Sequence, residues 1–169
     1  MSSQNNMDFR TVELEDFAVN CKEDLLRTTI LVPIERDFHG RMMYDRQTPW
    51  ELIEDFEQFK EYIKSLSVED VINYRDELDG NILSSFASSG KSIEWFEVIA
   101  LKVGDDDFMD MLMMKDRRAL CPFALISNVE TFATLLPYVN FDILLMRQII
   151  RNNRTDVLAY LASLMNQNN

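Results

Sequence analysis

The residues that could carry catalysis are few, and the sequence does not bring them together. His39 is the only histidine, and the two cysteines, Cys21 and Cys121, lie in opposite halves of the chain. A thiolate nucleophile needs a base held beside it, and nothing near His39 resembles such an arrangement. We therefore predict no catalytic residues, no enzyme activity and an ordinary loop position for His39.

Metal ligands and phosphate-binding groups are also weakly represented. Asp105-Asp106-Asp107 and Asp110 are close together, but a calcium loop needs oxygen ligands at alternate positions and a closing glutamate. Ser89-Gly90-Lys91-Ser92 ends like a phosphate-binding loop and lacks the glycine upstream of it. We predict no metal site and no cofactor. The three aspartates are expected to cap a helix over 108–114, with contact to a basic partner as the alternative.

The charge of the chain narrows the class of partner. It carries 29 acidic and 17 basic side chains, a net charge of −12. This charge repels phosphate groups, so we expect no direct binding to nucleic acid and no attraction to an anionic membrane. A basic protein partner is favoured because complementary potentials speed association. Solubility alone is the other explanation of the acidity.

Length and composition indicate one helical domain in a reducing compartment. The chain has 169 residues, 47% of them hydrophobic, and only four glycines and four prolines. Sheet proteins usually contain more turn residues, so helices are favoured. The two cysteines, the polar first residues and the lack of a long apolar run predict an intracellular protein of the cytoplasm or nucleus with no membrane helix.

The first 47 residues are predicted to form an N-terminal capping segment. The apolar residues between Val12 and Leu26 are spaced as in an amphipathic helix. Residues 28–34 are β-branched and suit a strand or an extended connector, and Pro33 argues against a central strand. Residues 36–47 are mixed and polar, and we expect a loop there.

From residue 48 to residue 165 the pattern is helical. Thr48-Pro49-Trp50-Glu51 has the residues of a helix start, and Ser67 and the Asp79-Gly80 turn are further boundaries, with Gly80 expected at positive φ. Gly104 is placed to end a helix. The last four residues, 166–169, are predicted to be frayed. Apolar residues at three- and four-residue steps predict helices over 52–66, 93–103, 129–136, 143–150 and 156–165.

The strongest sign of internal repetition is a residue pattern that recurs in the second half of the chain. The segments 83–90, 120–127 and 146–153 each begin with a large apolar residue, have two apolar residues three and four positions later, and end in a small or turn-forming residue. An acidic residue follows each of them. Repeats at such a spacing indicate stacked units that are each too small to bury their own apolar face.

This pattern resembles the ankyrin repeat, most persuasively over residues 70–136. Residues 71–76 are similar to an ankyrin finger, Asp79-Gly80-Asn81 is similar to its turn, and Lys115-Asp116 repeats the connection. The Thr-Pro-Leu-His signature of the family is absent from every copy, and residues 105–114 look like an insertion. The resemblance implies an all-α, short helical solenoid of three to four degenerate repeats over 48–165. A bundle of unrelated amphipathic helices is the alternative.

The resemblance also implies a protein-binding function, through the fingers and the first helix of each repeat. We expect a small acidic inhibitor or adaptor that docks on a basic protein. The alternative is a structural subunit of an oligomer or larger assembly, so self-association is left open. The expected contacts are Tyr74, Arg75, Asp76, Ser85, Ser88, Ser89, Asp105, Asp106, Asp107, Arg117, Arg118, Leu125 and Asn128, and for each of them an ordinary solvent-facing role is the alternative.

Overall fold

A computed structural model describes residues 30–36, 42–47, 53–152 and 154–168. The chain divides into two compact units, residues 1–66 and residues 67–169. The sequence placed a boundary at residue 47, so the helical stretch that ends at Leu66 falls in the first unit. The predicted helix over 12–26 lies outside the described residues.

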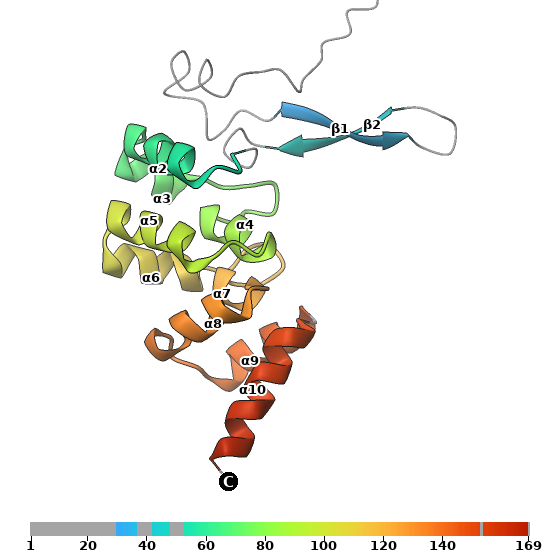
Figure 1. The fold of residues 1–169 in the computed structure, drawn as a ribbon, viewed down its shortest axis with the longest axis vertical. Helices are drawn as coiled ribbons and strands as arrows, with labels where there is room; N and C mark the ends of the chain where they lie inside the picture. The colour runs from blue at the N-terminus through green and yellow to red at the C-terminus, as the bar shows by residue number, and fades with distance from the viewer. Residues whose placement is uncertain (1–29, 37–41, 48–52, 153, 169) are drawn as a thin grey trace, which may run out of the picture. The chain divides into compact units, whose positions relative to one another are not determined.

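A β-hairpin forms part of the first unit (Figure 1). Strand β1, Ile30–Arg36, pairs antiparallel with β2, Met42–Gln47, with Pro33 opposite Tyr44 and a shift of register between Pro33 and Arg36. A proline is tolerated here because each strand of a two-stranded sheet has a free edge. The loop predicted over 36–47 is wrong for Arg36, which belongs to β1, and for residues 42–47. The sequence of β2 is polar and lacks the alternation that marks a half-buried strand.

Helix α2, Phe56–Ser65, is the one helix described in the first unit. It begins after Asp55, whose carboxylate accepts a 2.9 Å hydrogen bond from the amide of Gln58. The predicted start at Thr48-Pro49-Trp50-Glu51 lies outside the described residues, and residues 53–55 are not helical. Phe59, Tyr62 and Ile63 are buried at the three- and four-residue spacing that the sequence shows.

The second unit consists of short helices joined by tight connections. Their bounds agree with most of the helices predicted from the apolar spacing. In chain order they are α3 (Val68–Asn73), α4 (Ile82–Ser88), α5 (Ile93–Val103), α6 (Asp105–Met113), α7 (Pro122–Leu125), α8 (Val129–Leu135), the 3-10 turn η3 (Leu136–Tyr138), α9 (Ile143–Arg151) and α10 (Thr155–Gln167).

The helix ends follow from side-chain and glycine caps. Ser67 begins α3 by accepting a 3.0 Å hydrogen bond from the amide of Asp70, as predicted, and Asn128 and Asp142 begin α8 and α9 in the same way. Gly104 ends α5 at φ 92°, a conformation that favours glycine. Gly104 is also the residue before α6. Asp105, Asp106 and Asp107 therefore occupy the first turn of α6 and do not cap it, which corrects the prediction.

The helices of the second unit pack in two rows. Helix α4 contacts α7, which contacts α9, and α3 contacts α5, which contacts α8, which contacts α10. Figure 1 shows these pairs following one another along the unit. Helix α6 is additional to this order and packs against α4, α5 and α7, at the position where the sequence suggested an insertion. Each pair thus covers an apolar face of the next.

Aromatic rings and side-chain hydrogen bonds join the successive pairs. Phe86 meets Phe96 edge to face at 5.7 Å, and Phe123 stacks on Phe132 at 4.7 Å between ring centroids. All four rings are fully buried, and burying one such side chain is worth roughly 1.5–3 kcal/mol. The hydroxyl of Thr131 donates to the carbonyl of Lys91 across the two pairs at 3.1 Å.

Helices supply all the regular structure of residues 53–168, so the all-α prediction is confirmed for that part of the chain, and the hairpin is the exception. Helix α10 continues to Gln167, so the frayed tail predicted from residue 166 is wrong for residues 166 and 167. No helix among the described residues is long and apolar enough to cross a membrane.

Candidate protein-interaction surface

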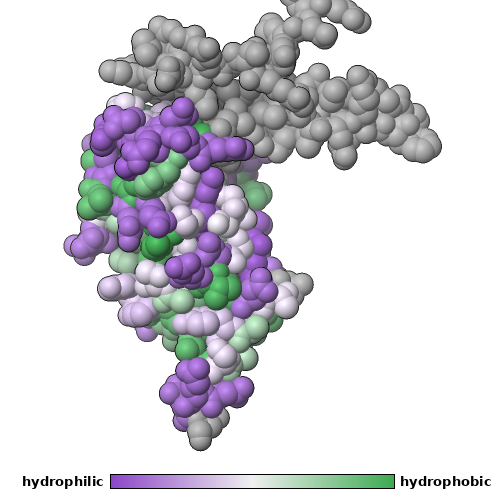
Figure 2. All heavy atoms as spheres, viewed as in Figure 1, coloured by the Kyte–Doolittle hydropathy of each residue, from purple (hydrophilic) through white to green (hydrophobic). Residues whose placement is uncertain are grey.

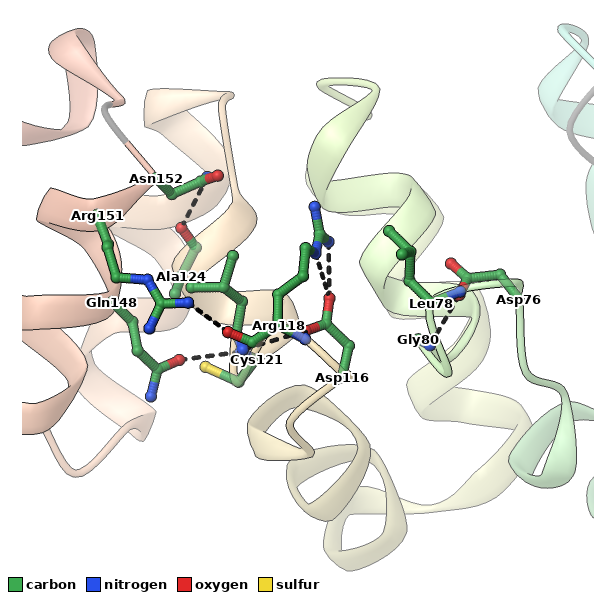
Figure 3. Close-up of polar contacts among 11 residues, drawn as sticks. Asp76, Leu78, Gly80, Asp116, Arg118, Cys121, Ala124, Gln148, Arg151 and Asn152 are labelled. Atoms are coloured by element: carbon green, nitrogen blue, oxygen red, sulfur yellow. Dashed lines mark hydrogen bonds and ion pairs between the residues drawn. The ribbon is translucent and has the colours of Figure 1, made fainter. Parts of the chain in front are cut away.

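The connection before α4 is a turn organised by one carboxylate. The amide of Asp76 donates to the carbonyl of Gly80 at 2.8 Å. Oδ1 of Asp76 accepts from the amides of Leu78 and Gly80, both at 2.8 Å (Figure 3). Asp79 takes the left-handed conformation, with φ 64°, and Gly80 does not. The sequence therefore predicted the turn correctly and the residue with positive φ wrongly.

The connection before α7 repeats this turn with different residues. The amide of Asp116 donates to the carbonyl of Leu120 at 2.9 Å, and its Oδ1 accepts from the amides of Arg118 and Leu120 at 2.8 and 3.2 Å. Ala119 has φ 60°. The carboxylate of Asp116 is buried, and its Oδ2 also accepts from Nε and Nη2 of the Arg118 guanidinium, at 2.9 and 2.6 Å.

The two turns lie side by side and set the correspondence between helix pairs. The amide of Arg117 donates to the carbonyl of Leu78 at 2.8 Å. Because Asp116 takes the place of Asp76, Leu83 corresponds to Phe123. The sequence alignment placed Leu83 with Leu120, which is wrong. It matched the apolar residues of two helices of unequal length, α4 with seven residues and α7 with four.

Two of the expected contact residues are buried. Tyr74 is 4% exposed, and Leu125 is 1% exposed. Tyr74 directly follows α3 and Leu125 ends α7, where the packing of the rows encloses both side chains. Neither can present its side chain to a partner, which corrects their assignment as contacts.

Most of the expected contact residues in the turns use their side chains for hydrogen bonds within this part of the fold. Arg75 is half-buried and donates from Nη1 to the carbonyl of Ile72 at 2.7 Å. Asp76 and Arg118 make the contacts described above. Arg117 is exposed, and its side chain has no hydrogen bond or ion pair with any residue that the structure describes. Of these residues, Arg117 is the one whose side chain is best placed to meet a partner.

The serine contacts lie on α4 and at its end. Ser88 and Ser89 are exposed, and Ser85 is half-buried. The hydroxyl of Ser89 donates to the carbonyl of Ser85 at 2.7 Å. Asn128 caps α8, and its amide nitrogen donates to the carbonyl of Gly90 at 3.5 Å, so it lies next to this end of α4. The structure thus brings Ser88, Ser89 and Asn128 to one place and the arginines to another.

The remaining expected contacts are exposed acidic residues of α6, which follows directly after the exposed acidic residues of α5. Asp105, Asp106 and Asp107 are exposed on the first turn of α6, one residue beyond the end of α5. Exposed Glu94 and Glu97 lie on α5, whose Leu101 is 88% exposed. A hydrogen bond from the Ser92 hydroxyl lowers the pKa of Glu94, which keeps its charge at neutral pH. We call Glu94, Glu97, Leu101, Asp105, Asp106, Asp107 and Asp110 the α5–α6 acidic surface.

Leu101 was missed by sequence reasoning, although the signal was present. The buried residues of α5, among them Trp95, Phe96, Ile99 and Val103, define its inner face. Leu101 falls on the opposite face, with Glu94 and Glu97 three and four residues apart along it. Once the inner face of α5 is assigned from its apolar spacing, Leu101 can be recognised as a leucine that faces solvent among carboxylates.

The described residues offer little for catalysis. They contain no group of three or more His, Cys, Asp or Glu side chains that could hold a metal ion. Cys121 is a free thiol, and burial raises its pKa, so the reactive thiolate is disfavoured. Cys21 and His39 lie outside the described residues. The buried position of Cys121 therefore does not activate its thiol as a nucleophile.

Comparison with known proteins supplies no relative. No protein-family model, no curated protein and no solved structure matches the chain.

Proposed function

We propose that this chain is a non-enzymatic protein-interaction module that uses its α5–α6 acidic surface to dock on a basic protein. We further propose that residues 67–168 form a short helical solenoid of degenerate ankyrin-like repeats. The two rows of helices and the recurring aspartate turn support that architecture. Such stacked repeats offer extended, preformed surfaces and commonly serve to bind other proteins.

The observation that carries this proposal is Leu101, which is 88% exposed on a helix face shared with Glu94 and Glu97. An apolar side chain surrounded by charge is suited to anchor an interface, because it enters a pocket while the rim excludes water. Residues 67–113 contain eleven acidic and only three basic side chains. The field of this region attracts a basic partner and fixes its orientation.

The mechanism is docking without chemistry. The acidic surface lies on helices whose inner faces are fixed by fully buried side chains, including Phe96, Ile99 and Leu112. It is therefore preorganised, and binding orders few groups. A small rigid module that covers a basic site acts as an inhibitor, and one that also holds a second protein acts as an adaptor.

Affinity capture from a native lysate, quantified at low and high salt, tests the proposal. The variant Glu94→Lys + Glu97→Lys should no longer capture the basic protein. Leu101→Asp should weaken capture although it leaves the acidic residues in place, because it removes the apolar anchor. The control Glu54→Lys + Glu57→Lys makes the same charge change on exposed residues of the first unit. Equal loss from the control, or capture that is indifferent to salt, would contradict docking through this surface.

A further inference from the structure

The C-terminal end of the helix rows presents an apolar and basic face. Helix α9 is the last helix of its row, and Ile143, Leu144 and Ile150 on it are 69%, 54% and 56% exposed. Exposed Arg147 and Arg151 lie on the same side of the helix as these residues. We call these five residues the α9 end face.

The α9 end face is directed away from the preceding helix pair. Leu145 and Ile149 are the buried residues of α9, and α9 packs on α7. In the row, α7 is enclosed on both sides, and all four of its residues are buried. Among the residues that the structure describes, no helix covers α9 in the way that α9 covers α7.

Side chains of α9 hold it to the backbone of the preceding pair, so the face has a fixed orientation. Oε1 of Gln148 accepts from the amide of Cys121 at 2.9 Å, and the Arg151 guanidinium donates to the carbonyl of Arg118 (Figure 3). Asn152 donates to the carbonyl of Ala124 at 3.4 Å. The end face is therefore a defined part of the fold.

An apolar depression continues this face toward α10. It has a volume of about 460 Å³ and is open to solvent. Figure 2 shows hydrophobic residues at the surface of this end, next to the hydrophilic tip of α10. The depression is lined by Leu136, Phe141, Met146, Leu161, Leu164, Met165 and Asn168. An apolar depression with charged groups beside it is typical of a binding site.

The later half of the second unit has a charge opposite to that of its earlier half. Residues 114–169 contain six basic and four acidic side chains, against three and eleven in residues 67–113. Arg147 has no ion pair with any described residue, and Arg151 reaches a backbone carbonyl only. The Arg147 guanidinium can therefore bind a carboxylate of another molecule, and Arg151, which donates one N–H to the Arg118 carbonyl, keeps further donors for a second one.

We propose that the α9 end face binds an acidic amphipathic helix of a partner protein. Apolar residues at three- and four-residue steps on that helix would contact Ile143, Ile150 and the depression beside Met146. Carboxylates flanking them would pair with Arg147 and Arg151. A symmetric second copy fits less well, because two of the five residues of this face are arginines and none is acidic, so two copies would bring like charges together.

The chain then has two docking surfaces that select opposite partners. The α5–α6 acidic surface takes a basic protein, and the α9 end face takes an acidic one. Two distinct surfaces on one rigid unit make an adaptor, and they disfavour a simple inhibitor. The end-face inference rests on its own residues, and it stands if the acidic surface binds nothing.

Fluorescence anisotropy with the full chain tests the end face. The probe is a labelled helical peptide with leucines at positions i, i+3, i+4 and i+7 and glutamates between them. A second peptide has the same composition in scrambled order. We expect saturable binding of the first peptide, and Arg147→Glu + Arg151→Glu should weaken it about tenfold or more. Ile150→Asp should also weaken binding of the first peptide, although both arginines keep their charge.

The control variant Lys60→Glu + Lys64→Glu makes the same charge change on α2, where the lysines pair with Glu57 and Glu61 at three-residue spacing, and such surface pairs carry little energetic weight. It should leave peptide binding unchanged, and circular dichroism should show all variants folded. Equal binding of the scrambled peptide would overturn the proposal, and so would no binding of the amphipathic one. Sedimentation that shows a dimer of the chain, dissociated by Ile150→Asp, would assign the face to a second copy and also overturn it.

Discussion

The turn around Asp76 and the turn around Asp116 have the same hydrogen bonds but different residues at equivalent places. In both, the aspartate carboxylate accepts from the amides two and four residues later. The last residues of the two turns differ: Gly80 in the first corresponds to Leu120 in the second. The feature that the two turns share is therefore the aspartate carboxylate at the start of each.

The two carboxylates differ in their surroundings. Asp116 is 7% exposed and has the Arg118 guanidinium as a counterion, whereas Asp76 is half-buried and has no ion pair with any described residue. A buried charge that loses its partners costs more than an exposed one. We infer that the second turn depends more strongly on its aspartate than the first.

Replacing the two aspartates tests this inference and has the largest expected effect. Asp116→Ala should lower the free energy of unfolding by about 3 kcal/mol, because it removes two amide contacts and a charged pair. Asp76→Ala should cost roughly half as much. Urea unfolding of both variants measures the difference, and equal losses would show that burial of Asp116 adds nothing.

A side chain at Gly80 should be the next most damaging change. A Cβ there would lie 2.9 Å from Oδ2 of Asp76 and 3.1 Å from Cβ of Ser84. Since φ of Gly80 is not positive, the obstacle is close approach and not backbone strain. Gly80→Val should cost about 2 kcal/mol. Gly80→Val should cost less when it is measured against Ser84→Gly than against the wild type, and an equal cost would assign the loss to another cause.

The side chain of Asn81 connects the first turn to α6, whereas side chains of α9, Gln148 and Arg151, connect to the backbone of the second turn. Nδ2 of Asn81 donates to the carbonyl of Met111 at 2.7 Å, and its Oδ1 accepts from the amide of Leu83 at 3.1 Å. Asn81→Ala should cost about 1–2 kcal/mol, since a buried carbonyl loses its donor. Hydrogen exchange should show faster opening of α6 than in the wild type. Unchanged exchange in α6 would mean that Asn81 acts only as a helix cap.

The parts of the fold that the sequence could predict depend on neighbouring residues. Ser67 begins α3 and Gly104 ends α5, because caps act within one helical turn. The inner faces of the helices follow from three- and four-residue spacing in the same way. The turn at Asp79-Gly80 was also recognised, because the residue types themselves favour it.

The parts that the sequence could not predict depend on packing between segments far apart. Tyr74 and Leu125 were expected to be exposed, but neighbouring helices bury them. Strand β2 needs a partner strand to exist, and its own sequence carries no alternation. Leu101 and the α9 end face could be recognised only once the structure showed which helix surfaces have no cover.

The smallest expected effect concerns the residue with positive φ in each turn. Ala119 has φ 60°, and this conformation costs an L-residue roughly 1–2 kcal/mol, whereas aspartate, as at Asp79, tolerates it better. Ala119→Gly removes the strain but makes the unfolded chain freer, so the net gain should be a few tenths to about 1 kcal/mol. Asp79→Gly should gain less than Ala119→Gly in the same thermal unfolding measurement. A loss of stability in Ala119→Gly, or a larger gain at Asp79, would mean that the second turn holds its alanine without strain and that the carboxylate alone distinguishes the two turns.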